Sequence, residues 1–386
     1  MTFVSHIEVL TVELPFRFSF GHALAERRSS TNVLVRLALA DGSVGWGEGV
    51  PREYVTGETV EGAKAALAER LAPALLGSPV DSARDVPDVF QEAVEGADAE
   101  LDLAARCALE LAFLDACGKH FRASVQRWLG AAPAPEVRYD AVIPFSSPRK
   151  LVALALVIRA LGIRQVKIKV GDDLDRDLHS LELLRRVLGQ DVDLRVDANC
   201  AWTPAEAVDA IERMGLHRIA AVEQPVAGDD VEGLRHVSDA VTVPVIADES
   251  LRTVEEARRL AEANACGAFN IRVSKCGGLL DSMRIAAIAA EAGIFCVVGA
   301  QVGESGILSA AGRHAAAAIA PRYLEGSGGS LLLRRDLTEE RVLPGRRGRA
   351  KVFPGRRGLG VRVREELVEE TGSVARVLEV AGAGVS

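Results

Sequence analysis

The sequence predicts an α/β protein in which an α+β unit precedes a closed barrel of parallel strands. From about residue 137 to 330, one unit repeats: a short β-branched run, a polar or glycine-containing turn, and a segment with helical periodicity. Eight such strand-like runs favour a closed barrel over an open sheet. The runs are Val137–Ile143, Gln165–Val170, Leu194–Asn199, Ile219–Gln224, Val243–Asp248, Ala268–Ser274, Phe295–Gly299 and Tyr323–Gly326.

Helical segments separate these runs. One of them begins with a hydroxyl cap at Thr203, a proline at the first helical position, Pro204, and then Glu206, a pattern typical of a helix start. Alternation of helices with strands is what parallel strand pairing requires. The predicted helices are Leu174–Leu188, Pro204–Met214, Val231–Ala240, Val254–Asn264, Leu279–Ala292 and Gly306–Ala318.

The first 130 residues have a different pattern, with alternating strands followed by helices. We therefore expect a domain at residues 1–130 and a barrel domain at 131–344. The segment from about 345 to 386 contains only short predicted elements separated by turns, and we expect it to pack with the first domain. Expected N-terminal strands are Ile7–Leu14, Thr31–Leu39 and Gly42–Glu48, expected helices are Thr59–Leu75 and Ala99–His120, and Leu359–Val363 has strand character.

The composition excludes several classes of protein. Hydrophobic residues make up 48% and charged residues 26%, which is typical of a folded globular chain. A net charge of -8 repels polyanions, so nucleic acid is an unsuitable partner. No apolar run is long enough to span a membrane, and the six cysteines lack metal-ligand spacing, which predicts reduced core thiols and a cytoplasmic location. The arginine- and glycine-rich run at 345–358 is interpreted as a solvated turn rather than a phosphate-binding patch.

Charged residues interrupt the predicted barrel strands in a regular way. Lys167 and Lys169 alternate with apolar residues, so both point to one face of their strand. Asp197, Glu223, Asp248 and Lys275 then follow, one barrel unit apart, at the carboxyl ends of successive strands, where barrel enzymes build their sites. Three converging carboxylates suit a hard divalent cation such as Mg²⁺. The alternative is a set of structural salt bridges, but so many charges placed in register would be costly to desolvate without a function.

These lysines and acids, in this order and at these spacings, resemble those of the muconate lactonizing enzyme subgroup of the enolase superfamily, in the mandelate racemase/muconate lactonizing enzyme family. The segments that carry the resemblance are KIK at 167–169, DAN at 197–199, the later acids and Lys275, together with VGWGEGVP and ALELAFLDACGKHFRASVQRWLG before the barrel. The resemblance implies a (β/α)7β modified TIM barrel with an N-terminal α+β capping domain.

The same resemblance implies Mg²⁺-dependent removal, through an enediolate, of the proton α to a substrate carboxylate, with Mn²⁺ as a substitute metal. Asp197, Glu223 and Asp248 would be the metal ligands. Lys169 and Lys275 would act as base and acid on the two sides of the substrate carbon. Lys167 would lower the pKa of Lys169 through its neighbouring charge.

The resemblance leaves the reaction open. The predicted seventh strand is followed by Ala300 and Gln301 with no histidine base, so Lys275 favours this subgroup over that of mandelate racemase. We expect racemisation or epimerisation of an amino-acid or acid derivative. The alternatives are a cycloisomerase of the muconate lactonizing type, a syn-dehydratase of the o-succinylbenzoate synthase type, and an inactive homologue that only binds a carboxylate or metal.

Candidate substrate contacts are Glu304, Asn199, Arg27 and Tyr54, with Arg28 and Arg52 as further residues of the cap loops that we expect to close the barrel mouth. Dipeptide epimerases of the subgroup carry an acidic DxD pair near the eighth strand. This chain has only Glu325 there, which weakens a dipeptide assignment. We expect a small-molecule carboxylate substrate, no nucleic-acid or membrane partner, and a homo-oligomer.

Overall fold

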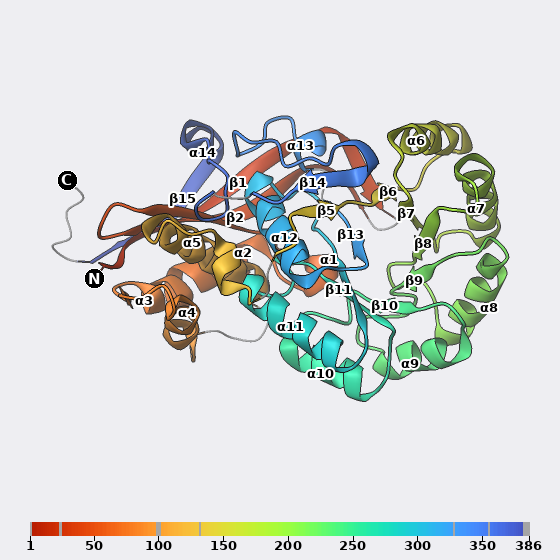
Figure 1. Cartoon of the computed structure of the whole chain (residues 1–386), viewed down its shortest axis with the longest axis horizontal. Helices are drawn as coiled ribbons and strands as arrows, with labels where there is room; N and C mark the ends of the chain where they lie inside the picture. The colour runs from red at the N-terminus through yellow and green to blue at the C-terminus, as the bar shows by residue number, and fades with distance from the viewer. Residues whose placement is uncertain are drawn as a thin grey trace.

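A parallel eight-stranded barrel forms the larger part of the molecule (Figure 1). The structure, a computed structural model, describes residues 2–22, 25–97, 102–130, 133–326, 329–353 and 356–380, without the side chains of 19–27. The strands pair in the order β6 to β13, and the amide of Asp140, just before β6, donates to the carbonyl of Leu324 in β13 at 2.7 Å. This bond links the first and last strands, as a closed barrel requires.

Each of the strands β6 to β12 is followed by one of the barrel helices α6 to α12, so the predicted (β/α)7β barrel is confirmed. The strands are β6 Ala141–Ile143, β7 Gln165–Lys169, β8 Asp193–Asp197, β9 Ala221–Glu223, β10 Val245–Ala247, β11 Ala268–Ile271, β12 Phe295–Val298 and β13 Tyr323–Leu324. The helices are α6 Pro148–Leu161, α7 Leu174–Leu188, α8 Pro204–Gly215, α9 Val231–Ala240, α10 Val254–Glu262, α11 Leu279–Glu291 and α12 Gly306–Ile319.

Two barrel elements differ from the predictions. The run at 137–143 is two strands, because β5 (Glu136–Arg138) pairs antiparallel with β14 (Arg349–Lys351) and only β6 joins the barrel. Helix α6 was not predicted. Its apolar residues occur on its exposed side as well as on its core side, with Leu156 54% and Val157 55% exposed, and this weakens the one-sided periodicity of a surface helix.

The N-terminal unit is an antiparallel sheet covered by helices. Strand β15 (Gly372–Glu379) pairs with β1 of this sheet, whereas the predicted strand at 359–363 forms only one isolated bridge, between Val363 and Thr338. The domain boundaries near 130 and 345 stay a prediction. The other elements are β1 Thr2–His22, β2 Ala25–Leu39, β3 Val44–Gly49, β4 Pro79–Val80, α1 Glu53–Thr56, α2 Val60–Ala66, the π-helix η1 Leu67–Leu71, α3 Ala72–Leu75, α4 Val86–Val94, α5 Leu103–His120 and η2 Val125–Trp128. After the barrel come α13 Gly329–Leu332, η3 Arg346–Gly348 and α14 Glu365–Thr371.

Helix α5 packs directly on the backbone of β3. Gly45, Gly47 and Gly49 alternate and so share one face of the strand. A Cβ atom on Gly47 would lie 1.9 Å from the carbonyl oxygen of Ala108, and a Cβ on Gly49 would lie 2.0 Å from that of Ala104. Only glycine therefore allows this approach.

The N-terminal unit also holds the starts of two barrel helices. The buried Glu110 of α5 accepts the amides of Leu279 at 2.5 Å and Leu280 at 3.2 Å, at the first turn of α11. The buried Glu48 of β3 accepts the amides of Ser305 and Leu308 at 3.1 Å each, at the first turn of α12. Carboxylates suit these positions because a helix N-terminus carries partial positive charge and unpaired amides.

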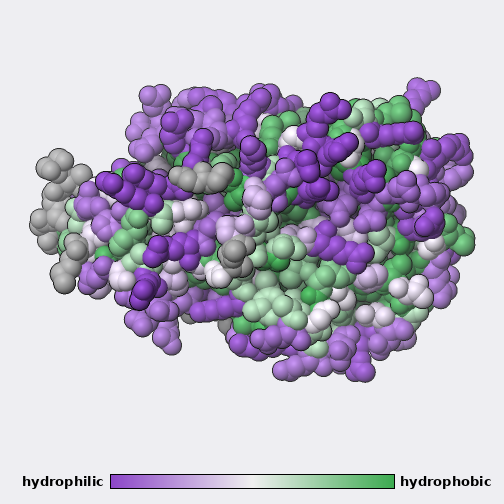
Figure 2. Space-filling model, in the orientation of Figure 1, coloured by the Kyte–Doolittle hydropathy of each residue, from purple (hydrophilic) through white to green (hydrophobic). Residues whose placement is uncertain are grey.

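The surface and the cysteines agree with the composition. Polar residues cover the outer rim of the face in Figure 2, and apolar residues gather toward its centre. Among the described helices, none is long and apolar enough to cross a lipid bilayer. All six cysteines are unpaired thiols, and all but Cys200 are buried, as predicted.

Candidate active site

The carboxyl-terminal rim of the barrel brings the predicted residues together. Lys169 is the last residue of β7, Asp197 of β8 and Glu223 of β9, and Asp248 directly follows β10. Lys169 is the register partner of Asp197, which is in turn the partner of Glu223. Lys275 does not end its strand as predicted. It lies in the turn between β11 and α11, because the pairing of β11 with its neighbours stops at Ile271.

Each lysine is paired with a carboxylate. Lys167 Nζ lies 2.8 Å from Glu223 Oε1 and 3.2 Å from Asp197 Oδ2. Lys169 Nζ lies 3.4 Å from Asp197 Oδ2 and also donates to the side-chain oxygen of Asn199. Although burial alone would raise it, the charges of Lys167 and Lys169 hold the pKa of Asp197 well below its ordinary value.

Lys275 lies on the other side of the acids. Its Nζ is 2.8 Å from Asp248 Oδ1, 2.5 Å from the backbone oxygen of Asp248 and 3.0 Å from the backbone oxygen of Asn270. The side chain is fully buried, and burial lowers its pKa to about 8. An amine with such a pKa is partly neutral near physiological pH and can accept a proton.

The three carboxylates differ in their partners. Across the described ranges, no three acidic, histidine or cysteine side chains are grouped so that they could hold a metal ion. The Asp248 carboxylate pairs with Arg272 and Lys275, and Glu223 accepts from Lys167. The donor chemistry nevertheless fits a hard divalent cation, since all three are carboxylates on adjacent strand ends. One buried oxygen, Glu223 Oε2, accepts no hydrogen bond from the described residues and lies 3.6 Å from Arg195 Nη1.

Two residues at this rim were missed in the sequence. Asn270 Nδ2 donates to Glu223 Oε1 at 2.9 Å, and Arg272, besides its pair with Asp248, donates to Gln301 Oε1 at 3.1 Å. Both alternate with apolar residues in FNIRV, the same signal that identified Lys167 and Lys169. The same alternation therefore predicts that Asn270 and Arg272 point to one face of their strand.

A buried ionic network lies beneath Lys167 inside the barrel. Arg195, its register partner on β8, is fully buried and donates to Asp140 Oδ2 at 2.6 Å and to Glu325 Oε1 at 2.9 Å. The other oxygen of Glu325 lies 2.9 Å from Lys167 Nζ. Glu325 is therefore engaged by two cations within the barrel, and it holds Lys167 against Glu223.

The predicted substrate contacts are scattered. Glu304 is buried, its Oε1 accepts the amide of Gln301 at 2.6 Å, and burial raises its pKa to about 8. Asn199 lies at the rim, where its Nδ2 donates to Glu249 Oε1 at 3.1 Å. Tyr54, in α1, is 38% exposed.

The arginine candidates differ from one another. The side chain of Arg27 lies outside the described residues, and Arg28 is exposed. Arg52 is buried and donates to the carbonyls of Pro51 at 2.7 Å and Val302 at 2.9 Å. It therefore links the loop before α1 to the loop after β12, and its role as a substrate contact stays a prediction.

Residues 4–130 match the family described as mandelate racemase / muconate lactonizing enzyme, N-terminal domain, and residues 150–367 match the family described as enolase C-terminal domain-like. The chain belongs to the mandelate racemase/muconate lactonizing enzyme group of the enolase superfamily. It is similar to the N-succinyl-L-Arg/Lys racemase of Bacillus cereus, at 29% identity over 81% of this chain and 84% of that one. It is also 32% identical to the L-Ala-D/L-Glu epimerase of Bacillus subtilis, over 81% of this chain and 85% of that one.

Solved structures of this superfamily superpose over nearly the whole chain. The N-succinyl Arg/Lys racemase from Bacillus cereus has a TM-score of 0.87 at 27% identity and covers 97% of this chain and 100% of its own. A dipeptide epimerase from Enterococcus faecalis, complexed with Mg and L-Leu-L-Tyr, scores 0.82 at 28% identity over 93% and 99%. Muconate lactonizing enzyme from Pseudomonas fluorescens, with muconolactone, scores 0.86 at 29% identity over 96% and 100%. The predicted family and the assignment as an enolase-superfamily isomerase are confirmed.

Proposed function

We propose that this isomerase is a Mg²⁺-dependent racemase or epimerase of an amino-acid derivative with a free α-carboxylate. One observation carries the proposal. Lys169 at the end of β7 and Lys275 after β11 lie on opposite sides of Asp197, Glu223 and Asp248, which lie at the carboxyl ends of β8, β9 and β10. A substrate carbon held over the acids would meet one amine on each side.

Asp197, Glu223 and Asp248 are the residues that would hold the cation. Bound Mg²⁺ would supply positive charge beside the substrate carboxylate, where negative charge grows as the α-proton leaves. Arg272 and Lys167 supply counter-charge to the same carboxylates, at Asp248 and Glu223 respectively. The protein therefore balances its buried acids with its own cations, as buried charges require.

Proton transfer would use the two amines in turn. In one direction Lys169 removes the α-proton and Lys275 returns a proton to the opposite side, and in the other direction the roles reverse. Lys275 is held by three oxygen acceptors, the backbone oxygens of Asp248 and Asn270 and the Asp248 carboxylate, which fix its amine in the site. Fixed placement is needed because proton transfer requires hydrogen-bond distance to the substrate.

The contacts of Glu325 favour one class of substrate over another. It is bonded to Lys167 and Arg195, which leaves it poorly suited to bind a substrate ammonium. This supports an N-acyl amino acid, in which the α-nitrogen carries no charge, ahead of a dipeptide with a free amino terminus. The similarity to an N-succinyl-L-Arg/Lys racemase also favours an N-acyl amino acid over a dipeptide. A homo-oligomer and a cytoplasmic location stay predictions.

A second candidate is cycloisomerisation, which is favoured by the superposition on muconate lactonizing enzyme. In that reaction one lysine transfers the proton and the carbon skeleton changes. Racemisation leaves the skeleton intact and inverts one centre. The products therefore separate the two candidates.

The decisive experiment is α-proton exchange in D₂O with Mg²⁺, followed by proton NMR and chiral chromatography. A panel of N-acyl amino acids and dipeptides, each as separate enantiomers, should contain a substrate whose two enantiomers both lose the α-proton signal. Lys169→Ala should abolish exchange for one enantiomer and Lys275→Ala for the other. Lys64→Ala, at a partly exposed position of α2 away from the barrel rim, is the matched control.

Either of two results would contradict the proposal. In the first, exchange from both enantiomers persists in each lysine variant, so these amines are not the proton carriers. In the second, exchange occurs from one side only and gives a rearranged product, which establishes the cycloisomerase instead.

A further inference from the structure

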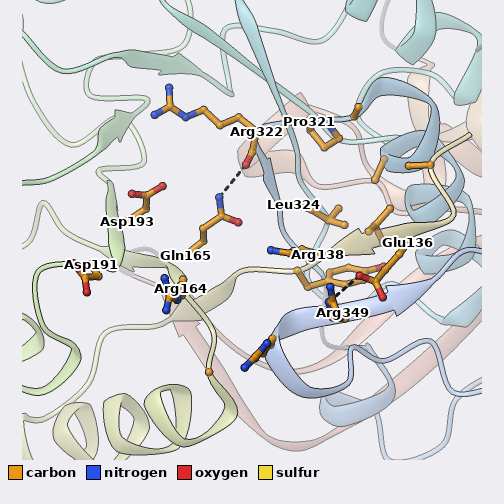
Figure 3. Close-up of a pocket in the computed structure, with 17 residues that line it drawn as sticks. Glu136, Arg138, Arg164, Gln165, Asp191, Asp193, Pro321, Arg322, Leu324 and Arg349 are labelled. Carbon is orange, nitrogen blue, oxygen red and sulfur yellow. Dashed lines mark hydrogen bonds and ion pairs between the residues drawn. The ribbon is translucent and has the colours of Figure 1, made fainter.

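A cavity of about 860 Å³ opens at the amino-terminal end of the barrel, on the face opposite the lysines and acids described above. Its walls include the first residues of β7 and β8 and the turn before β13, together with β5, β14 and η3 (Figure 3). The volume falls within the range of small-molecule sites, roughly 300–1,000 Å³.

The cavity is rich in arginine. Five arginines and three acidic residues line it, an excess of two positive charges in a protein whose net charge is -8. They are Arg138, Arg164, Arg322, Arg347 and Arg349, with Glu136, Asp191 and Asp193. The run at 345–358 therefore supplies two cavity arginines and is more than the solvated turn predicted from the sequence.

Within the described residues, most of these guanidinium groups form no ion pair with a carboxylate. The Arg349–Glu136 pair, at 2.9 Å, is the ion pair found among the described lining residues. Arg322 lies over the rings of Phe295 and Tyr323, at 5.0 and 5.5 Å. Arg138 and Arg164, from facing walls, have neither an ion pair nor a side-chain hydrogen bond within the described chain, and in Figure 3 they lie on opposite sides of the cavity.

The backbone at Arg347 has an unusual conformation. Arg347 has φ 58°, a left-handed conformation that residues with a Cβ rarely adopt. A Cβ on the facing Gly162 would come 3.2 Å from Arg347 Cγ, so the glycine leaves room for the arginine along the cavity wall.

Hydrogen-bond acceptors line the same side as Arg164. Gln165 Nε2 donates to the backbone oxygen of Arg322 at 3.0 Å, which leaves the amide oxygen of Gln165 as an acceptor. Asp191 and Asp193 lie near it in Figure 3, and neither forms an ion pair within the described residues. The cavity thus offers uncommitted cations together with acceptors for hydroxyl groups.

We infer that this cavity is a binding site for an organic phosphate that carries hydroxyl groups. Guanidinium forks match phosphate oxygens in geometry, and a phosphate monoester brings the two negative charges that the lining lacks. The hydroxyl groups would donate to Gln165 and the two aspartates. The site is remote from the lysine pair, so it does not depend on the proposed function.

The test is calorimetric titration of the full-length protein with ribose 5-phosphate at low ionic strength, without added metal. We expect saturable binding that weakens as salt is added. The double variant Arg138→Gln, Arg164→Gln should weaken it about tenfold or more, because each substitution removes a charge-assisted contact. Arg235→Gln, which removes an exposed arginine from α9, should leave the affinity unchanged.

Further probes test the two halves of the site. Ribose without phosphate should not bind, and inorganic phosphate should bind more weakly than ribose 5-phosphate. The inference is overturned if wild-type protein shows no saturable binding at millimolar ribose 5-phosphate, or if the double variant, folded by circular dichroism, binds as well as wild type. Equal affinities for inorganic phosphate and ribose 5-phosphate would overturn the assignment to an organic ligand.

Discussion

Acid should destabilise this protein through His314, a fully buried residue of α12. Its Nδ1 lies 3.0 Å from Gln126 Nε2, which donates, and its Nε2 lies 3.0 Å from the backbone oxygen of Leu359, which accepts. The ring is therefore neutral, with its proton on Nε2. Burial lowers the pKa of His314 to about 4, and a second proton on Nδ1 would face the Gln126 donor.

The sign and size of the effect follow from this pKa. In the unfolded chain the pKa returns to its ordinary value of 6.5, so the unfolded state binds more protons than the folded state between about pH 6.5 and 4. Stability is therefore lost as the pH falls through that window. Between pH 7 and pH 5 the contribution of His314 amounts to about 2 kcal/mol.

Urea unfolding at pH 7 and pH 5 measures this contribution. In His314→Gln the side chain keeps a donor and an acceptor but does not titrate. The free energy of unfolding of this variant should therefore fall between pH 7 and pH 5 by about 2 kcal/mol less than that of wild type. His236→Gln, at an exposed position of α9, is the control and should behave as wild type. Equal losses in wild type and His314→Gln would refute the reasoning.

Three further predictions concern the site and the core. Asp248→Asn should reduce metal-dependent turnover at least about 100-fold with an unchanged circular dichroism spectrum, and undiminished turnover would exclude Asp248 as a ligand. Glu325→Gln should lower the free energy of unfolding, measured in urea, by about 3 kcal/mol, because the buried Lys167 and Arg195 lose a shared negative partner. A decrease below about 1 kcal/mol would mean that this ionic network contributes little to stability. Gly47→Ala should destabilise by about 3 kcal/mol or more, since its methyl group meets the α5 backbone. Gly312→Ala, in a helix with open space around it, should be neutral or stabilising when both variants are compared by urea unfolding.

The rim of the barrel could be predicted from the sequence because its spacing is regular. Strand side chains alternate, and each βα unit returns the chain to the same edge, so Lys169, Asp197 and Glu223 had to lie near one another. Their partners could not be predicted. Whether Glu223 is bonded by Lys167 or by a metal depends on distances across strands that no linear pattern contains. Arg195 shows this best, since its contacts with residues far along the chain set its role.

The errors in the fold also come from contacts distant in sequence. β5 separates from β6 because β14, some 200 residues later, offers it a partner. Helix α4 was not predicted from the sequence, and the helix predicted at 59–75 contains the π-helical turn η1. Helix α6 carries apolar residues on its exposed side, which hides the amphipathic signal.

The two glutamates that cap α11 and α12 make the barrel incomplete by itself. A fragment beginning after residue 130 would lack Glu48 and Glu110. The first backbone amides of α11 and α12 would then lose their carboxylate acceptors. Attempts to produce the catalytic half in isolation, or to graft it onto the first half of a relative, must therefore carry both acids along. Residues 1–130 contain neither Lys169 nor Lys275, but through Glu48 and Glu110 they stabilise the barrel that carries both lysines.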